Sequence, residues 1–394
     1  MQFGKTLVVL AAAFLGGLSA CSEAAAPSPA RAQELGDRTR QIGAVLQGQL
    51  DAAVTEGRIP SAIALVARGP NVIWMGTSGD MGPNTPMRTD AIIPLASIGK
   101  LYTATAAMIL VERAQVSLDD AVSDYIAEFA TGAGDGVTIR HLLTHTSGLT
   151  VNGNAYWNVW NEHAGHTTTL DMARGIAALP RVREPGTAFE YGGTGGNYEI
   201  LAAVIEIVSG QTLEAFMVEN IFSPLGLNDT YFFIPDEKID RLPAFYGFED
   251  SELILSRAMG EEYPRNDYFF GGGGISTSAQ DALRFAQLFL NDGEVDGVRI
   301  LETRSVEQMM SDQLSPLPAL SNGMGWGFGG AVTRDATPDN RRQYGWIGGS
   351  YAMLFVDRTS GLVLYVVTPI EPPGDIDFLM QFQDTMTETL SAGE

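Results

Sequence analysis

The sequence predicts an α/β (α+β) fold, in which one antiparallel sheet built from both chain ends is flanked by helices and a mostly helical subdomain is inserted. Strand-like patterns occur near both ends of the chain, at residues 62–67, 72–76, 324–328, 351–357 and 362–367. The segments between them are mainly helical in pattern. The helix expected after Ser97 is apolar nearly all round, which is typical of a helix buried in the middle of a fold.

The first elements follow from local spacing. Past Leu35, apolar residues recur at helical spacing until Pro60, where a helix must have ended. Two strand patterns then surround Gly69-Pro70-Asn71, and this order predicts a hairpin.

The middle and the C-terminal part complete the prediction. Helices are expected at residues 139–143, 198–208, 213–221 and 279–291, and a final amphipathic helix carries Phe378 to Leu390. We therefore expect one large domain over residues 36–394. Its α/β part spans about 36–110 and 295–394, and its helical part spans about 111–294.

The N-terminus has the pattern of a targeting segment. Lys5 precedes an apolar stretch, residues 6–17, that is too short to span a bilayer. Leu18-Ser19-Ala20-Cys21 resembles a bacterial lipobox, which implies a signal peptide at residues 1–20 and lipidation of Cys21. Residues 21–35 are rich in Ala, Pro and Ser and read as a flexible tether. We expect a lipid-anchored protein of the bacterial cell envelope that faces the periplasm.

Composition excludes several classes of protein. The chain has 394 residues, of which 47 are acidic and 24 basic, so its formal net charge is −23. Nucleic acid is not an expected partner, because binding it requires clustered lysine and arginine. Cys21 is the only cysteine, so the mature chain has no internal disulfide. No cofactor is predicted, and the sequence does not predict the oligomeric state.

Ser97-Ile98-Gly99-Lys100 carries the strongest chemical signal. Residues three apart share one face of a helix, so the Lys100 amine can reach the Ser97 hydroxyl and take or relay its proton. Lysine is rare here, since the chain has only Lys5, Lys100 and Lys238 among its 24 basic residues. An arginine could not lose a proton at a workable pH, whereas a lysine can. This pair therefore predicts a serine nucleophile.

Further segments accompany this pair. They are His141 to Leu149, Glu184 to Tyr191, Ile221 to Leu227, Gly271 to Thr277, and Tyr344 to Gly349. Together with Ser97 and Lys100, they resemble the serine β-lactamase and penicillin-binding-protein superfamily over about residues 40–370. The nearest members are class C β-lactamases, D-aminopeptidases, DD-peptidases and family VIII esterases.

The resemblance implies roles by position. Ser97 would form the acyl-enzyme, Lys100 would be its proton partner, and Tyr191 would act as base or carry the proton to the leaving group. A phenol needs a nearby cation to act as a base at neutral pH, and Lys100 would supply it. The oxyanion hole would consist of the backbone amides of Ser97 and Gly349.

Two departures from the superfamily pattern bear on the substrate. Gly193 stands where a Tyr-x-Asn motif has its asparagine, so one polar contact is missing. Trp346-Ile347-Gly348 stands where Lys-Thr-Gly is common. An indole cannot pair with a substrate carboxylate, and it offers an apolar wall that suits a neutral acyl or alcohol group instead. Trp-x-Gly at this place is frequent in family VIII esterases. We therefore expect Trp346, Gly348 and Gly193 to shape a site for neutral esters.

Alternatives stay open at this stage. A β-lactamase, a D-amino-acid peptidase acting on amides, and a non-catalytic envelope binding protein share most of these segments. A zinc hydrolase is suggested only by the i,i+4 spacing of His141 and His145, and Leu142 occupies the place of the glutamate in a His-Glu-x-x-His motif. No Gly-x-Ser-x-Gly elbow is present. We therefore predict a serine hydrolase without a metal. Small-molecule carboxylic esters are its preferred predicted substrates.

Overall fold

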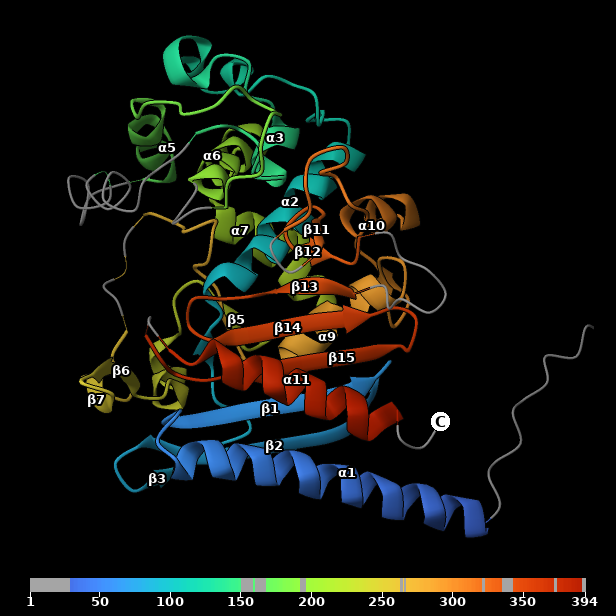
Figure 1. Ribbon diagram of the computed structural model, residues 1–394. Coiled ribbons are helices and arrows are strands. Elements are labelled where there is room, and N and C mark those ends of the chain that lie inside the picture. Colours follow the sequence, from blue (N-terminus) through green and yellow to red (C-terminus); the bar gives the residue numbers. More distant parts are fainter. Residues whose placement is uncertain are drawn as a thin grey trace, which may run out of the picture. The chain divides into compact units, whose positions relative to one another are not determined.

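Both ends of the chain contribute strands to one sheet in the computed structural model (Figure 1). Strand β1 (Ser61–Arg68) lies between β15 (Leu362–Val367) and β2 (Asn71–Gly82), antiparallel to both. Leu65 pairs with Tyr365 on one side and with Met75 on the other. The predicted antiparallel sheet built from both chain ends is therefore confirmed.

The sheet has the strand order β11-β12-β13-β14-β15-β1-β2-β3. Its remaining strands are β3 (Thr85–Pro86), β11 (Gly325–Trp326), β12 (Ala331–Val332), β13 (Gln343–Ile347) and β14 (Ala352–Asp357). Shorter sheets are formed by β4 (Ile93–Pro94), β8 (Ser276–Thr277) and β5 (Thr230–Tyr231), by β6 (Phe245–Glu249) and β7 (Glu252–Arg257), and by β9 (Glu294–Val295) and β10 (Val298–Arg299).

Alternate residues of the central strands belong to different cores. In β1, Ile63 and Leu65 pack into the large core, whereas Ala64 and Val66 pack into a second core. This alternation is the period of two that a strand imposes on its side chains. The second core also holds residues of α1 (Pro29–Thr55) and α11 (Ile376–Ser391), namely Leu46, Leu50, Phe378 and Phe382. The sheet is thus buried on both faces.

The large core holds the helices of the inserted part. Helix α2 (Gly99–Glu112) is buried over Gly99 to Leu110, as its apolar pattern predicts. The other helices are α3 (Ile139–Leu143), α5 (Thr169–Ala177), α6 (Asn197–Ser209), α7 (Leu213–Met217), α8 (Ser223–Leu225), α9 (Ala279–Leu290) and α10 (Thr303–Met309). Helix α9 is capped at its start by Ser278, whose hydroxyl oxygen accepts a hydrogen bond from the Asp281 amide.

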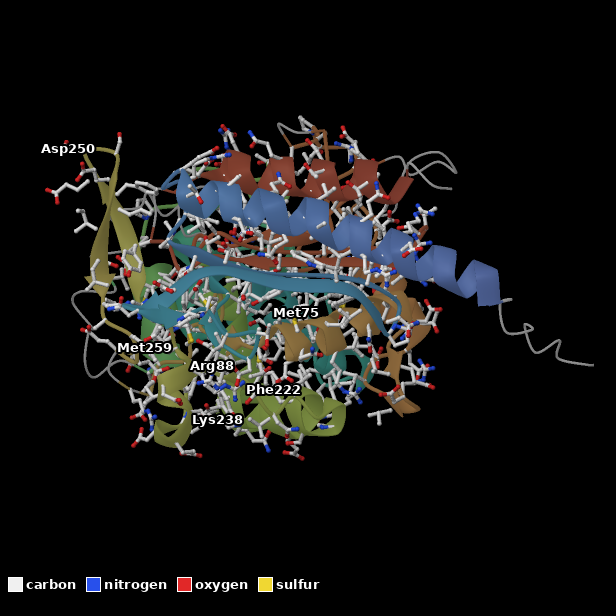
Figure 2. All side chains as sticks on the ribbon, turned by 90° about the horizontal axis from the view of Figure 1, so that it is seen from below. Met75, Arg88, Phe222, Lys238, Asp250 and Met259 are labelled. Atoms are coloured by element: carbon white, nitrogen blue, oxygen red, sulfur yellow. The ribbon has the colours of Figure 1, made fainter. Side chains whose placement is uncertain are left out.

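Several boundaries differ from those expected. The first helix begins at Pro29 and so includes part of the segment that we expected to be a tether. The helix expected at residues 213–221 divides into α7 and a π-helical turn at Val218–Phe222, and the strand expected at 324–328 contracts to β11. Figure 2 shows an element that sequence patterns missed, the β6–β7 hairpin with Asp250 in its turn.

The structure describes residues 29–149, 159, 168–191, 196–262, 265, 267–320, 323–334, 343–371 and 374–391. The predicted signal peptide, Cys21, Gly193, His163 and His166 lie outside these ranges. The described residues from Thr39 onward form one compact unit, and the described residues up to Arg38 belong to another. Within the described ranges, no single helix is long and apolar enough to cross a membrane. The bent pair Asn197–Ser209 and Leu213–Leu225 passes by length and composition only, and most of its α6 residues are buried in the core.

Candidate active site

Ser97 lies in a 3₁₀ turn, Ala96–Ile98, directly before α2. Ala96 has φ of 46°, a left-handed conformation that is uncommon for a residue with a side chain and often occurs at functional sites. Lys100 follows in the first turn of α2, and its Nζ lies 3.1 Å from Ser97 Oγ. The contact predicted from the i,i+3 spacing is therefore present, although Ser97 precedes the α-helix instead of beginning it.

A glycine turn at residues 271–274 holds Lys100 from the other side. Lys100 Nζ donates to the Gly272 carbonyl at 2.8 Å. The turn packs closely against α6. A Cβ on Gly271 would lie 2.3 Å from the Tyr198 carbonyl oxygen, and one on Gly272 would lie 2.6 Å from Glu199 Oε1. The glycines thus permit the close approach that aims the Lys100 amine at Ser97.

Lys238, the other lysine of the compact unit, has different partners. Lys238 Nζ pairs with Asp229 at 2.8 Å and also donates to the Tyr231 hydroxyl. Asp229 also pairs with Arg241 at 2.7 Å. Lys238 is therefore part of an ion-pair network, and Lys100 is the lysine that lies beside a serine hydroxyl.

Tyr191 is brought to the same place from the loop that precedes α6. Its ring centroid lies 5.4 Å from Lys100 Nζ. Its hydroxyl oxygen accepts a hydrogen bond of 2.7 Å from Trp346 Nε1, at the end of β13. An indole N–H can only donate, so the Tyr191 oxygen is the acceptor here and keeps one lone pair and its own proton for other partners.

Trp346 therefore has a contact that its sequence position did not suggest. We expected an apolar wall against the substrate, and the structure shows its indole N–H on Tyr191. Its ring also packs against Tyr191 and Trp326, with centroid distances of 4.9 and 4.7 Å. Trp346 is not among the residues that line the pocket beside Ser97.

Gly348 and Gly349 lie where β13 ends beside the Ser97 turn. A Cβ on Gly348 would lie 2.2 Å from the Leu95 carbonyl oxygen and 3.2 Å from the Ser97 nitrogen. Ser350 Oγ donates to the Pro94 carbonyl at 2.9 Å and ties the same turn to the chain before Ser97. Gly349 lies in this turn and is exposed. The predicted pair of backbone amides, Ser97 and Gly349, therefore belongs to neighbouring segments.

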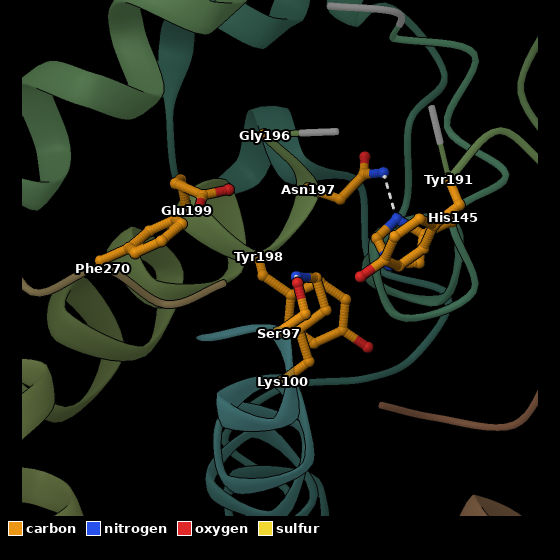
Figure 3. Close-up of a pocket in the computed structure, with 9 residues that line it drawn as sticks. All are labelled: Ser97, Lys100, His145, Tyr191, Gly196, Asn197, Tyr198, Glu199 and Phe270. Carbon is orange, nitrogen blue, oxygen red and sulfur yellow. Dashed lines mark hydrogen bonds between the residues drawn. The ribbon is translucent and has the colours of Figure 1, made fainter. Parts of the chain in front are cut away.

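A pocket of about 80 Å³ opens beside Ser97 (Figure 3). The described residues that line it are Ser97, Lys100, His145, Tyr191, Gly196, Asn197, Tyr198, Glu199 and Phe270. The structure thus brings together the three catalytic candidates that the sequence predicts. Sequence patterns did not identify Asn197, Glu199 or Phe270 as site residues. The only signal for them was their position beside the Tyr191 and glycine-turn segments.

Burial shifts the pKa values of two groups in this pocket. Glu199 is 3% exposed, and burial raises the pKa of its carboxyl, an effect that nearby Lys100 partly opposes. His145 is 1% exposed, and burial lowers the pKa of its imidazole well below the usual value, an effect that Lys100 reinforces. The pocket therefore holds a neutral histidine.

The two histidines considered as a zinc pair have separate partners. His141 Nδ1 accepts from the Thr138 amide and completes a capping box at the start of α3, whereas His145 Nδ1 contacts Asn197. Among the described residues, no group of three or more His, Cys, Asp or Glu side chains is arranged to hold a metal ion.

Comparison with known proteins agrees with this geometry. The beta-lactamase family model matches residues 46–381. Esterase EstB of Burkholderia gladioli is 30% identical over 369 residues, which cover 83% of this chain and 90% of the relative. Penicillin-binding protein 4 of Amycolatopsis lactamdurans is 30% identical over 341 residues, covering 82% and 84%. The solved structure of EstCE1, a hydrolase with promiscuous acyltransferase activity, has a TM-score of 0.72 and 26% identity, covering 91% and 99%.

The chain belongs to the beta-lactamase family, as the resemblance predicted. The prediction that it is a serine hydrolase is confirmed at the level of this family.

Proposed function

We propose that the protein hydrolyses carboxylic esters through an acyl-enzyme on Ser97. Ser97 Oγ attacks the ester carbonyl carbon, and the Ser97 proton passes to the Tyr191–Lys100 pair. The oxyanion that forms accepts hydrogen bonds from the Ser97 and Gly349 amides. The carbon–alkoxide bond breaks, the alcohol leaves with the proton, and a water molecule then hydrolyses the acyl-enzyme by the same proton route.

The contacts at Ser97 support this sequence of steps. Lys100 Nζ lies within hydrogen-bond reach of Ser97 Oγ and is anchored by Gly272. The Tyr191 oxygen accepts a hydrogen bond from Trp346 and, as a phenol oxygen, has a second lone pair. Figure 3 shows the Tyr191 hydroxyl on the side of Ser97 and Lys100. A proton acceptor held in place in this way is what general base catalysis requires.

The charge of the pocket carries the proposal for an ester. Lys100 is the one cation among the described lining residues, and Ser97 and Gly272 already occupy it. The one carboxyl group among them is the buried Glu199. Among the described lining residues, a substrate carboxylate such as that of a penicillin or a peptidoglycan stem would find no free cation and would meet Glu199. A neutral ester requires no cation as partner and is not repelled by Glu199. The 30% identical relative named as an esterase supports the same choice.

Substrate preference tests this proposal. We expect kcat/KM to be higher for p-nitrophenyl butyrate than for an anionic chromogenic cephalosporin on one enzyme sample. One missing charge-assisted hydrogen bond is worth roughly 1.5–3 kcal/mol, or about one to two decades. Glu199→Gln keeps the acceptor and removes the charge. It should therefore shift the ratio toward the cephalosporin by roughly tenfold, the equivalent of about 1.4 kcal/mol of repulsion.

Glu206→Gln is the matched control. Glu206 is a half-buried carboxyl on the same helix, but it contacts Thr169 and Leu213 outside the pocket. Its replacement should leave the ratio unchanged. A higher kcat/KM for the cephalosporin on the unmodified enzyme would reject the esterase assignment in favour of a β-lactamase.

We also propose that the protein is anchored in the cell envelope by lipid on Cys21. The Leu18-Ser19-Ala20-Cys21 motif supports this proposal. Cys21→Ser should move the protein from the membrane fraction to the released fraction, because multiple acyl chains hold a protein stably at a membrane. Immunoblots of fractionated cells measure this. Equal distribution of the two proteins would reject the anchor.

A further inference from the structure

His145 occupies a constrained position behind Tyr191. Its side chain is 1% exposed, and its backbone has φ of 54°. A left-handed residue that is not glycine costs conformational energy, and such residues persist where their surroundings hold them. The His145 carbonyl accepts a 2.8 Å hydrogen bond from the amide of Glu190. The residue next to Glu190 is Tyr191, so the backbone of His145 positions the Tyr191 segment directly.

A directional set of hydrogen bonds ends on the His145 ring. The Leu149 amide donates to Ser147 Oγ at 3.2 Å, so the Ser147 proton is free to point to Asn197 Oδ1, which lies 2.6 Å away. The other end of the Asn197 amide, Nδ2, then faces His145 Nδ1 at 3.0 Å (Figure 3). An amide nitrogen donates, so Nδ1 is the acceptor and the imidazole carries its proton on Nε2. Among the described residues, the buried Nε2 has no hydrogen-bond partner.

The His145 ring lies against Tyr191. Their ring centroids are 4.8 Å apart with an interplanar angle of 66°, an edge-to-face contact. On another side, Trp326 contacts the His145 ring at 5.2 Å with an angle of 72°. Since Trp346 holds the Tyr191 oxygen, the tyrosine is held at its hydroxyl by one residue and at its ring by another.

Burial and the Lys100 cation disfavour an imidazolium at His145. Lys100 approaches from α2, Tyr198 and Glu199 come from α6, and Tyr191 comes from the loop before α6. The cation of Lys100 and burial together lower the His145 pKa well below its usual value. A protonated His145 would lose the hydrogen bond from Asn197 and would place a second cation beside Tyr191 and Lys100.

We propose that His145 is a positioning residue for Tyr191, and that the Ser147–Asn197 hydrogen bonds keep it as the uncharged Nε2–H tautomer so that it can pack against that ring without competing with Lys100. The inference deepens the proposed function, because it assumes that Tyr191 takes part in proton transfer at Ser97. His145 itself touches no reacting atom in this scheme.

Nuclear magnetic resonance tests the tautomer directly. The chain has only four histidines, so ¹⁵N-histidine labelling of the whole protein gives few imidazole signals, and His145→Asn identifies the signal of interest. We expect it to show the Nε2–H pattern and not to titrate between pH 5 and pH 8, whereas an ordinary histidine titrates near ~6.5. A signal that titrates in that range, or one with the Nδ1–H pattern, would overturn the inference.

Two variants test the effect on Tyr191. His145→Asn keeps an acceptor for Asn197 and tolerates the left-handed backbone, but it removes the ring. We expect kcat for p-nitrophenyl butyrate to fall roughly 10- to 100-fold with little change in KM, because misplacement of a catalytic group costs up to about that much. An unchanged kcat in a folded variant would overturn the positioning role.

Asn197→Asp places a carboxylate on Nδ1 and favours the imidazolium. We expect a new acid limb in its kcat profile, near pH 6–7, that the unmodified enzyme lacks. Asn220→Asp, the same change at a site bonded to Arg113 away from the pocket, is the control and should show no new limb. Superimposable profiles of Asn197→Asp and the unmodified enzyme would contradict the inference. The resonance arm requires no turnover, so failure of the serine mechanism, seen as full activity in Ser97→Ala, remains distinguishable from failure of the His145 assignment.

Discussion

Ser97→Ala is expected to lower kcat for ester hydrolysis by at least about 10⁴-fold, because the acyl-enzyme cannot form without the nucleophile. The variant should retain its fold, since Ser97 Oγ is bonded to Lys100 and Lys100 keeps its second partner at Gly272. Intact-protein mass spectrometry after treatment with a fluorophosphonate probe measures the covalent step. We expect one adduct on the unmodified enzyme and none on Ser97→Ala.

Ser256→Ala is the control for that experiment. Ser256 is an exposed serine on β7, outside the residues that line the pocket. Its replacement should leave both the adduct and the turnover intact. An equal adduct on Ser97→Ala would show that another residue is the nucleophile and would reject the proposed mechanism.

The second large effect is expected at Lys100. Lys100→Met keeps a long side chain in the same space and removes the amine, so the loss is chemical and not a packing defect. We expect kcat to fall about 10²- to 10⁴-fold, the usual contribution of a positioned proton-transfer group. Stopped-flow measurement of acylation separates this step from the hydrolysis of the acyl-enzyme, and thermal unfolding verifies that the variant is folded.

Tyr191→Phe distinguishes the two candidate bases. It keeps the ring that packs against His145 and Trp346, and it removes the oxygen that Trp346 holds. If Tyr191 is the base, both variants should lose the acylation step. If Tyr191→Phe acylates at nearly the unmodified rate while Lys100→Met does not, the base is Lys100 or a water molecule that it holds.

The fold was predictable where one local pattern decided the element. The apolar run after Ser97 matched a buried helix, and the continuous apolar runs at residues 62–67 and 362–367 matched strands that are buried on both faces. The prediction failed for short elements. The two-residue strand β11 and the β6–β7 hairpin depend on partners distant in sequence or on turn geometry, and neither leaves a period long enough to detect.

Some contacts of the active-site candidates were predictable from local spacing, and others were not. Ser97 and Lys100 are three residues apart, so helix geometry alone brings them into contact, and the measured 3.1 Å agrees. Tyr191 and Trp346 are 155 residues apart. Their hydrogen bond depends on β13 ending beside the Ser97 turn, which no local pattern contains. The prediction of Trp346 as an apolar wall considered the side chain by itself and missed the donor on its ring.

By itself, the sequence determined the class of chemistry and the family, because a serine and a rare lysine at helical spacing and the segments that accompany them are local features. Only the tertiary structure decided the state of the groups around them. Glu199 became the buried carboxyl of the pocket because the glycine turn at residues 271–274 packs directly against its helix, α6. His145 became a neutral side chain behind Tyr191, and not half of a metal pair, because Asn197 of α6 approaches its Nδ1. Burial and the direction of hydrogen bonds set protonation, and both depend on contacts between residues far apart in the chain.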